Sequence, residues 1–241
     1  MKIDKKELAK FLKKIKMDGT EGIDEAVFDF TTDGVKISAL TPANITRVNA
    51  MLYASVFENY EAINKIAIQN ISQIIKLLDR FKKMVEITVE GNILRLKEGS
   101  KKIETTLVDL QFVSVAPELN AVPEFDDVIK IAASDLNEFI KDALINSEFE
   151  LILETKPKQL ILKSTGKFKF ENTYACETAK GGVVVKLGQT FEHVAKNLTG
   201  TLELSLKTDY PVKLFEKTES SVITILTAPR VEKPKEDEWN G

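Results

Sequence analysis

Two hydrophobic periodicities alternate along this chain, and the alternation occurs four times. Four short segments place apolar residues at the i, i+3, i+4, i+7 spacing of an amphipathic helix: residues 4–16, 71–83, 134–145 and 188–198. Each is followed by stretches in which apolar and polar residues alternate, as in antiparallel strands, with turn signals such as Asp33-Gly34. The pattern predicts an α+β fold of two similar domains, each with antiparallel sheets backed by two short helices.

Residues 109–127 interrupt this pattern. They alternate poorly and contain two prolines, which is typical of a segment that crosses the surface between domains. The last residues of the chain are polar, as in a flexible tail. We therefore expect an N-terminal domain at 1–108, a connecting loop at 109–127, a C-terminal domain at 128–230 and a tail at 231–241.

Residue types that carry catalysis are scarce. The 241 residues include one histidine, His193, and one cysteine, Cys176, which excludes an internal disulfide framework and a Cys/His zinc site. The single cysteine fits a reducing compartment, and no apolar run reaches the roughly 20 residues of a membrane-spanning helix. Phosphate-loop, dinucleotide-binding, zincin and nucleophile-elbow motifs are missing from the sequence. We therefore expect no catalytic residue, metal or cofactor. The weakest alternative is an enzyme with a catalytic pair of carboxylates drawn from the 37 acidic residues.

Positive charge is concentrated on the expected helices of an acidic chain. The formal net charge is -3, yet residues 1–17 hold seven lysines against two acidic residues. Nine cationic residues lie opposite the apolar stripes of the four helices: Lys6, Lys10, Lys13, Lys14, Lys76, Arg80, Lys83, Lys141 and Lys196. Seven of the nine belong to the first two helices, whereas the third helix is net acidic.

This charge pattern has two interpretations. A lysine-rich helix face is most often only a solvated face. Two helices with the same bias on an otherwise acidic chain favour instead a surface that holds a polyanion. Aromatic side chains do not accompany the lysines, so contacts to the phosphates of duplex nucleic acid, which carry no sequence information, are the better hypothesis.

Three stretches resemble one protein family. The stretch EAVFDFTTDGVKISALTPANITRVNAMLYASVFENYE (25–61) contains a D-G-V hairpin and an L-x-x-x-x-F-x-x-Y run. Residues 106–125 begin with TLVDL and end with LNAVPEF, and residues 208–232 contain TDYPVKLFEK and ITILTAPRVE. In this order, and over almost the full length, the chain resembles a DNA sliding clamp of the proliferating cell nuclear antigen (PCNA) type.

The resemblance implies a ring without catalytic activity. Three two-domain subunits would close head to tail, with helices around a central hole and sheets as the outer wall. Edge strands at 101–108 and 167–174 would pair between subunits. The ring would encircle duplex DNA and tether a DNA polymerase, a clamp loader and other proteins with a PCNA-interacting peptide motif. The implied location is the cytoplasm of an archaeal or viral-type system, or the nucleus in a eukaryote.

Partners of this family insert a motif of the form Q-x-x-[LIM]-x-x-[FY]-[FY] into a pocket beside the connecting loop. The resemblance places ten residues of this chain at that pocket: Leu40, Asn44, Ile45, Leu119, Val122, Pro123, Pro211, Leu226, Ala228 and Pro229. For Leu40, Ile45 and Leu226, ordinary packing in a core or strand is the competing interpretation. Pro123 and Pro229 are more informative, because prolines stiffen exposed segments.

The chain departs from the family pattern in three ways. It is short between 174 and 190, its third helix is acidic where the family presents lysines to DNA, and Leu226 stands where an aromatic residue is frequent. Contacts to DNA are therefore expected mostly from the first domain. Two alternatives stay open: a subunit of a heterotrimeric ring, and a monomeric processivity factor that holds DNA on one open face.

Overall fold

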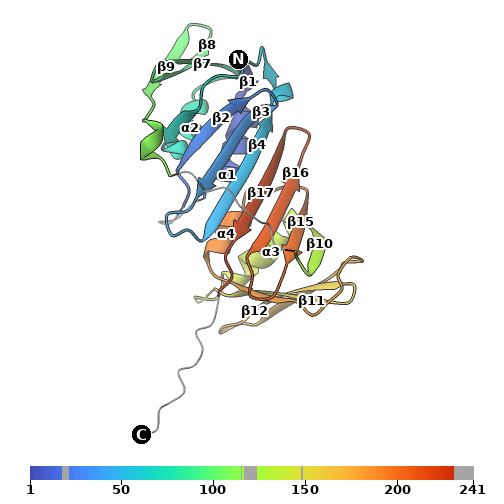
Figure 1. Cartoon of the computed structure of the whole chain (residues 1–241). Coiled ribbons are helices and arrows are strands. Elements are labelled where there is room, and N and C mark those ends of the chain that lie inside the picture. The colour runs from blue at the N-terminus through green and yellow to red at the C-terminus, as the bar shows by residue number, and fades with distance from the viewer. Residues whose placement is uncertain (18–21, 115, 117–123, 148, 231–241) are drawn as a thin grey trace.

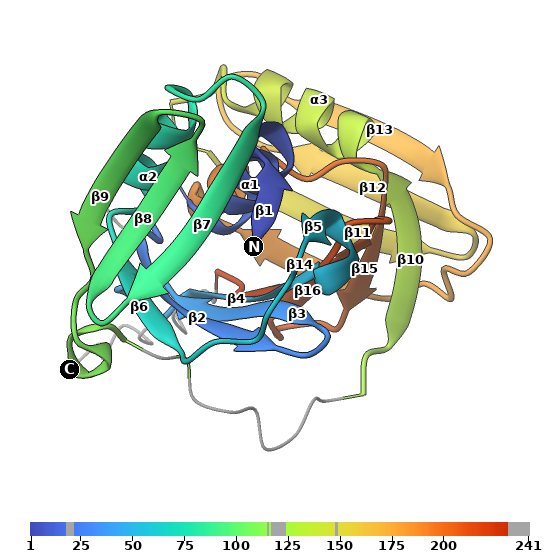
Figure 2. The same ribbon diagram turned by 90° about the horizontal axis from the view of Figure 1, so that it is seen from above.

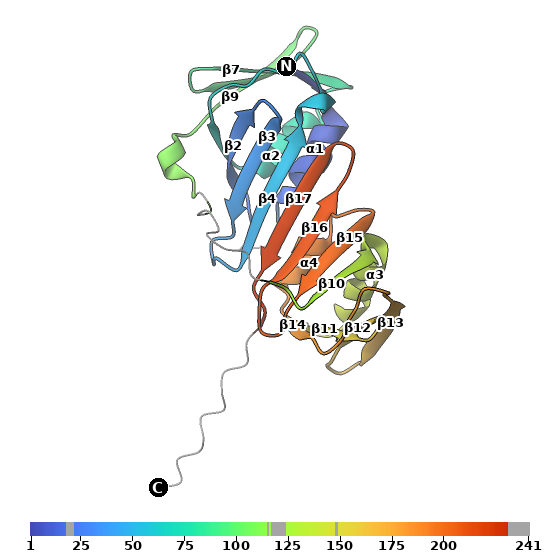
Figure 3. The same ribbon diagram turned by 45° about the vertical axis from the view of Figure 1, so that its right-hand side comes forward.

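The structure is a computed structural model that describes residues 1–17, 22–114, 116, 124–147 and 149–230. Within these residues, a central sheet of eight strands runs along the molecule (Figure 1). Smaller sheets of five and four strands lie at its two ends, as Figure 3 shows from the side. Every strand pair in the three sheets is antiparallel.

The first half of the chain forms the five-stranded sheet, in the order β5-β1-β7-β8-β9, and one side of the central sheet. Its elements are β1 (Lys2–Asp4), α1 (Lys5–Ile15), β2 (Glu25–Thr31), β3 (Gly34–Leu40), β4 (Thr46–Tyr53), β5 (Phe57–Glu58), β6 (Ile66–Gln69), α2 (Ile71–Leu78), β7 (Met84–Glu90), β8 (Ile93–Glu98) and β9 (Lys101–Thr106). A short 3-10 turn, Leu110–Phe112, follows β9 in the predicted connecting loop.

The second half forms the four-stranded sheet, in the order β13-β12-β11-β14, and the other side of the central sheet. Its elements are β10 (Asp127–Ala132), α3 (Ala133–Ala143), β11 (Leu151–Lys156), β12 (Gln159–Ser164), β13 (Phe170–Ala175), β14 (Val184–Leu187), α4 (Thr190–Ala195), β15 (Thr201–Leu206), β16 (Val212–Lys217) and β17 (Ser221–Thr227).

The two halves repeat one order of elements. In each half a strand precedes a helix, four longer strands follow, and a second helix leads into three more strands; β5 is a two-residue addition. The sheet connections repeat as well, since β1-β7-β8-β9 matches β10-β15-β16-β17 and β6-β2-β3-β4 matches β14-β11-β12-β13. This repeat makes β17 the counterpart of β9, and β4 the counterpart of β13.

The halves join through a shared sheet. Strand β17 pairs with β4 over seven residue pairs, from Ser221 opposite Leu52 to Thr227 opposite Thr46. The hydroxyl groups of Thr46 and Thr227 lie 2.9 Å apart and are buried at one end of this seam. The central sheet therefore continues from one half into the other, a connection that the sequence pattern does not predict.

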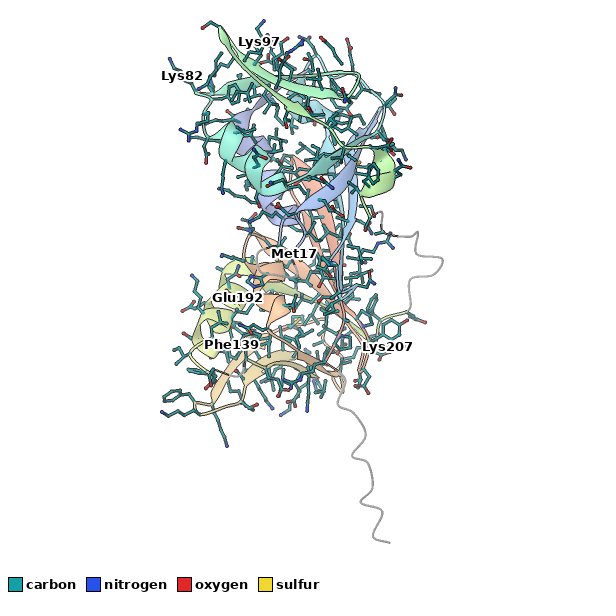
Figure 4. The ribbon with its side chains drawn as sticks, turned by 90° about the vertical axis from the view of Figure 1, so that its left-hand side faces the viewer. Met17, Lys82, Lys97, Phe139, Glu192 and Lys207 are labelled. Atoms are coloured by element: carbon teal, nitrogen blue, oxygen red, sulfur yellow. The ribbon has the colours of Figure 1, made fainter. Side chains whose placement is uncertain are left out.

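Helices α1, α2, α3 and α4, labelled in Figure 1, lie on one side of the central sheet, as the views from above and from the side show (Figures 2 and 4). The apolar stripe of α1 is buried at Leu8, Phe11, Leu12 and Ile15, each at most 9% exposed. Asp4 caps this helix, because its carboxylate accepts a hydrogen bond from the backbone N–H of Lys6 at 2.7 Å. One hydrophobic core then runs under the helices through both halves.

Two helices, α2 and α4, end three or more residues earlier than the sequence predicts. Helix α2 stops at Leu78 and not at 83, because the N–H groups of Arg80 and Phe81 bond three residues back and close a tight turn. Helix α4 likewise stops at Ala195 and not at 198. The cations that the sequence places at the end of the second helix therefore lie on a loop.

Candidate nucleic-acid interface and partner pocket

The exposed face of α1 is cationic. Lys6, Lys10 and Lys13 are exposed and stand one helical turn apart, on the side of the helix opposite its buried stripe. A hollow of about 260 Å³ lies along this face and ends at Asp79, after α2, and at Asn197, after α4. Asn197 also donates a hydrogen bond of 2.8 Å to the backbone oxygen of Lys13, which satisfies a carbonyl near the end of α1.

Lys14 does not belong to this face, and the prediction that it points outward is wrong. Its side chain is 2% exposed, and its Nζ lies 2.5 Å from Oε2 of Glu216 on β16. Thr199 donates to the other carboxylate oxygen through its N–H and its hydroxyl, at 2.6 and 2.9 Å. A buried charge requires such a partner, and Lys14 reaches Glu216 by turning toward the second half.

The cationic residues around α2 lie mostly on the loop that follows it. Lys76 is exposed on the helix, whereas Arg80 and Lys83 are exposed on the loop after Leu78. Lys82 is exposed on the same loop, and sequence reasoning missed it because the expected helix did not place it opposite the apolar stripe. In Figure 4 Lys82 lies on the helix side of the molecule.

The backbone of this loop is held by an acidic residue. The two carboxylate oxygens of Glu98, at the end of β8, accept hydrogen bonds from the N–H groups of Lys82 and Lys83 at 2.6 and 2.8 Å. These backbone hydrogen bonds, first that of Lys82, lower the pKa of Glu98 below its ordinary value. The carboxylate is therefore ionised at neutral pH and points at the loop that carries the cations.

The second half offers fewer cations on the same side. Lys141 of α3 and Lys196 after α4 are exposed, but Glu138 and Asp142 are exposed beside Lys141 on α3. Figure 4 shows Glu192 of α4 on the helix side and Lys207 on the opposite, sheet side. Positive charge on the helix side is therefore concentrated on α1 and on the loop after α2.

A second hollow, of about 200 Å³, lies where the shared sheet meets α4. It is lined by Ile45, Phe191 and the chain segment 227–230, and so it includes Ala228 and Pro229. The backbone N–H of Ala228 donates to the oxygen of Ile45 at 2.8 Å, which holds the two walls together. Three of the predicted pocket residues, Ile45, Ala228 and Pro229, therefore meet in one hollow.

The other predicted pocket residues lie apart from this hollow or outside the described residues. Leu40 and Leu226 are half-buried on the outer face of the central sheet, each opposite Arg47 of the strand between them. Asn44 is exposed with a φ of 57°, and Pro211 is half-buried just before β16. Leu119, Val122 and Pro123 are outside the part of the chain that the structure describes.

The described residues contain no group of three or more His, Cys, Asp or Glu side chains that could hold a metal ion. Among the described helices, none is both long and apolar enough to cross a membrane.

Strand β9 is one edge of the five-stranded sheet, and β13 is one edge of the four-stranded sheet. On β9, Ile103 packs against the core, while the flanking Lys102 and Glu104 are exposed. On β13, Phe170 packs against the core, while Glu171 is exposed. Each edge thus has an apolar side chain against the core and a charged side chain on the opposite face.

Sequence comparison finds DNA polymerase sliding clamps, and a search of family models finds no match. The DNA polymerase sliding clamp of Pyrococcus furiosus is 26% identical over 234 residues, covering 87% of this chain and 90% of the relative. The DNA polymerase sliding clamp 1 of Sulfolobus acidocaldarius is 24% identical over 251 residues, covering 91% of this chain and 96% of the relative.

Structure comparison finds PCNA. The A. fulgidus PCNA bound to the C-terminal region of FEN-1 matches with a TM-score of 0.84 and 19% identity over 97% of this chain and 98% of the other. The PCNA of Entamoeba histolytica matches with a TM-score of 0.80 and 15% identity, over 95% and 98%. The fold is therefore that of the DNA sliding clamps. Within that class it is the PCNA-like α+β fold, which confirms the predicted fold class and the resemblance.

Proposed function

We propose that this chain is a DNA polymerase sliding clamp, a non-catalytic processivity factor that encircles duplex DNA. The observation that carries the proposal is similarity to DNA polymerase sliding clamps over about nine-tenths of the chain, on a PCNA-like fold. A tethered polymerase that dissociates stays at a high effective concentration near its template, which raises processivity without any chemistry. We keep the boundaries 1–108, 109–127 and 128–230 as the proposed domains.

Duplex DNA is proposed to pass along the helix side of the molecule. The support is the exposed cationic row Lys6, Lys10 and Lys13, together with the cations of α2 and of the loop after it. Such side chains neutralise phosphates and release counterions, so binding is independent of base sequence and weakens with salt. The acidic neighbours of Lys141 leave the second half a smaller share of these contacts.

The internal repeat supports a ring. Inside the chain β17 of the second half pairs with β4 of the first half. The counterpart of β17 is β9, the counterpart of β4 is β13, and both of these strands are sheet edges. An antiparallel pair between β9 of one copy and β13 of the next repeats the internal seam between molecules, and a head-to-tail contact of this kind closes into a ring. Ile103 and Phe170 then meet on the inner face, and three copies bring six similar domains around the hole.

The hollow at Ile45, Ala228 and Pro229 is proposed as part of a docking site for partner proteins. A hollow with an apolar lining suits a short peptide with hydrophobic and aromatic anchors. A DNA polymerase, a clamp loader or another replication factor would carry such a peptide. In a neighbouring structure the bound partner is the C-terminal region of FEN-1.

The oligomeric state in solution tests the ring. Multi-angle light scattering of the purified chain at micromolar concentration should give the mass of three chains of 27.0 kDa each. A monomer that only enters a larger particle with other clamp subunits would favour the heterotrimer, and a PCNA2-PCNA3 complex is known among the neighbours of this fold. A monomer that binds linear DNA by itself would favour the open-face processivity factor.

A further inference from the structure

Glu98 is an acidic residue beside the cationic loop that follows α2. It lies at the end of β8, and its carboxylate accepts hydrogen bonds from two consecutive backbone N–H groups, those of Lys82 and Lys83. By charge alone, an acid at this place opposes the binding of a polyanion. Its contacts to the backbone of the loop suggest another role.

Three carbonyl groups of the loop are held as well. The ammonium group of Lys101 donates to the carbonyl oxygen of Arg80 at 2.5 Å, and that of Lys5 donates to the carbonyl oxygen of Phe81 at 2.5 Å. The backbone N–H of Lys5 donates to the carbonyl oxygen of Lys83 at 2.8 Å. Two further lysines, Lys5 and Lys101, thus bind protein backbone and hold the loop in place.

The held loop has exposed cationic side chains. Arg80, Lys82 and Lys83 are all exposed, whereas Phe81 between them is buried and only 2% exposed. The backbone is thereby fixed on one side by Phe81 and on the other by Glu98. A side chain that starts from a fixed backbone loses less entropy when it contacts a phosphate.

We propose that Glu98 is a positioning residue for DNA binding: it holds the backbone of the loop after α2 so that Arg80, Lys82 and Lys83 point toward the phosphates. This inference rests on the proposed sliding-clamp function. Charge alone predicts that removal of this acid strengthens the binding of DNA. The positioning role predicts that its removal weakens binding.

The test uses Glu98→Gln and Glu98→Asp in the full chain, with a short fluorescent duplex and anisotropy over a series of salt concentrations. Glu98→Gln should weaken binding by about two- to tenfold and lower the slope of log affinity against log salt by about 1, as expected for one weakened phosphate contact. Glu98→Asp, which keeps the charge on a shorter side chain, should fall between Glu98→Gln and the parent. Glu90→Gln is the matched control. Glu90, the last residue of β7, pairs with Arg95 of β8, and its substitution should leave binding unchanged.

Equal or tighter binding by Glu98→Gln would overturn the proposal. If that variant does not fold, hydrogen exchange of the parent protein decides. Slow exchange of the Lys82 and Lys83 amides supports the proposed hold of Glu98 on the loop, and exchange at the rate of a free loop contradicts it. Charge reversal at Lys10 and Lys76 separates the positioning role of Glu98 from the proposal that DNA binds the helix side. If this reversal weakens binding and Glu98→Gln does not, only the positioning role fails; if neither has an effect, the DNA-facing surface itself is wrong.

Discussion

Lys14 of α1 and Glu216 of β16 form an ion pair at the junction of the two halves, with Nζ 2.5 Å from Oε2 and side chains 2% and 1% exposed. Breaking a buried pair leaves one charge uncompensated, so Glu216→Ala should lower the free energy of unfolding by about 3–5 kcal/mol. Chemical denaturation measures this loss. Lys13→Met, an exposed neighbour, is the control and should change stability by less than about 0.5 kcal/mol. A loss below about 1 kcal/mol for Glu216→Ala would contradict the burial of this pair.

The cationic helix side gives a second prediction. Lys10→Glu combined with Lys76→Glu should weaken DNA binding and lower the salt slope by about 2, because two phosphate contacts are lost, while self-association stays intact. The control is Lys36→Glu combined with Lys217→Glu. Lys36 is exposed on β3 between the buried Val35 and Ile37, and Lys217 is exposed at the end of β16 beside the buried Glu216, so the same charge change is made on the other side of the sheet. Equal losses from both pairs would mean that net charge, and not this surface, governs binding.

The sheet edges give a third prediction. Ile103→Asp on β9, or Phe170→Asp on β13, should convert the assembled protein to a monomer in light scattering, because each places a charge on the apolar inner face of the proposed seam. Ile152→Asp is the matched control. It lies half-buried on β11, an interior strand of the same sheet as β13, and should leave the mass unchanged. Assembly that survives both edge variants would require a different interface.

The hollow beside α4 gives a fourth prediction. Ile45→Asp should reduce the affinity for a peptide with a hydrophobic and aromatic anchor at least about tenfold, since it puts a charge on the apolar lining. Calorimetry measures the affinity, and an unchanged unfolding midpoint shows that the chain is folded. Val222→Asp, on β17 away from the hollow, should bind normally. Normal binding by Ile45→Asp would remove this residue from the docking site.

The lowered pKa values of three glutamates give a fifth prediction, on how folding stability changes with pH. Hydrogen bonds lower the pKa of Glu98 (from the backbone of Lys82), of Glu104 (from Lys102) and of Glu154 (from Lys163). A pKa lower in the folded than in the unfolded chain contributes stability above the ordinary glutamate value of about 4.3, and this contribution is lost as pH falls through the folded pKa. Thermal melts should therefore show a falling midpoint below about pH 4.3. A midpoint that rises with acid would contradict these contacts.

The order of helices and strands could be predicted from the sequence because local periodicity determines it. The stripe of α1 and the turn at Asp33-Gly34 are visible without any long-range contact. Burial of Lys14 could not be predicted, because its partner lies 202 residues away and a helical pattern shows only which side is less apolar. The seam between β17 and β4 depends in the same way on residues far apart in sequence.

The candidate site was predictable to a similar degree. Exposed lysines on α1 follow from its stripe. Lys82 was missed because a helix continued to residue 83 does not place it opposite the apolar stripe, whereas a tight turn ends α2 at Leu78. Of the pocket, Ile45, Ala228 and Pro229 meet in one hollow. Their role, like that of the DNA-facing lysines, stays a prediction until binding is measured.

Topological retention on DNA tests the central claim most directly. The purified chain is mixed with a linear duplex that carries biotin at both ends, streptavidin is added to half of the sample, and both halves are passed through a sizing column in high salt. A ring that encloses the duplex should stay on the blocked DNA and slide off the open DNA. Equal retention on both, or loss from both, would contradict a clamp that encircles DNA.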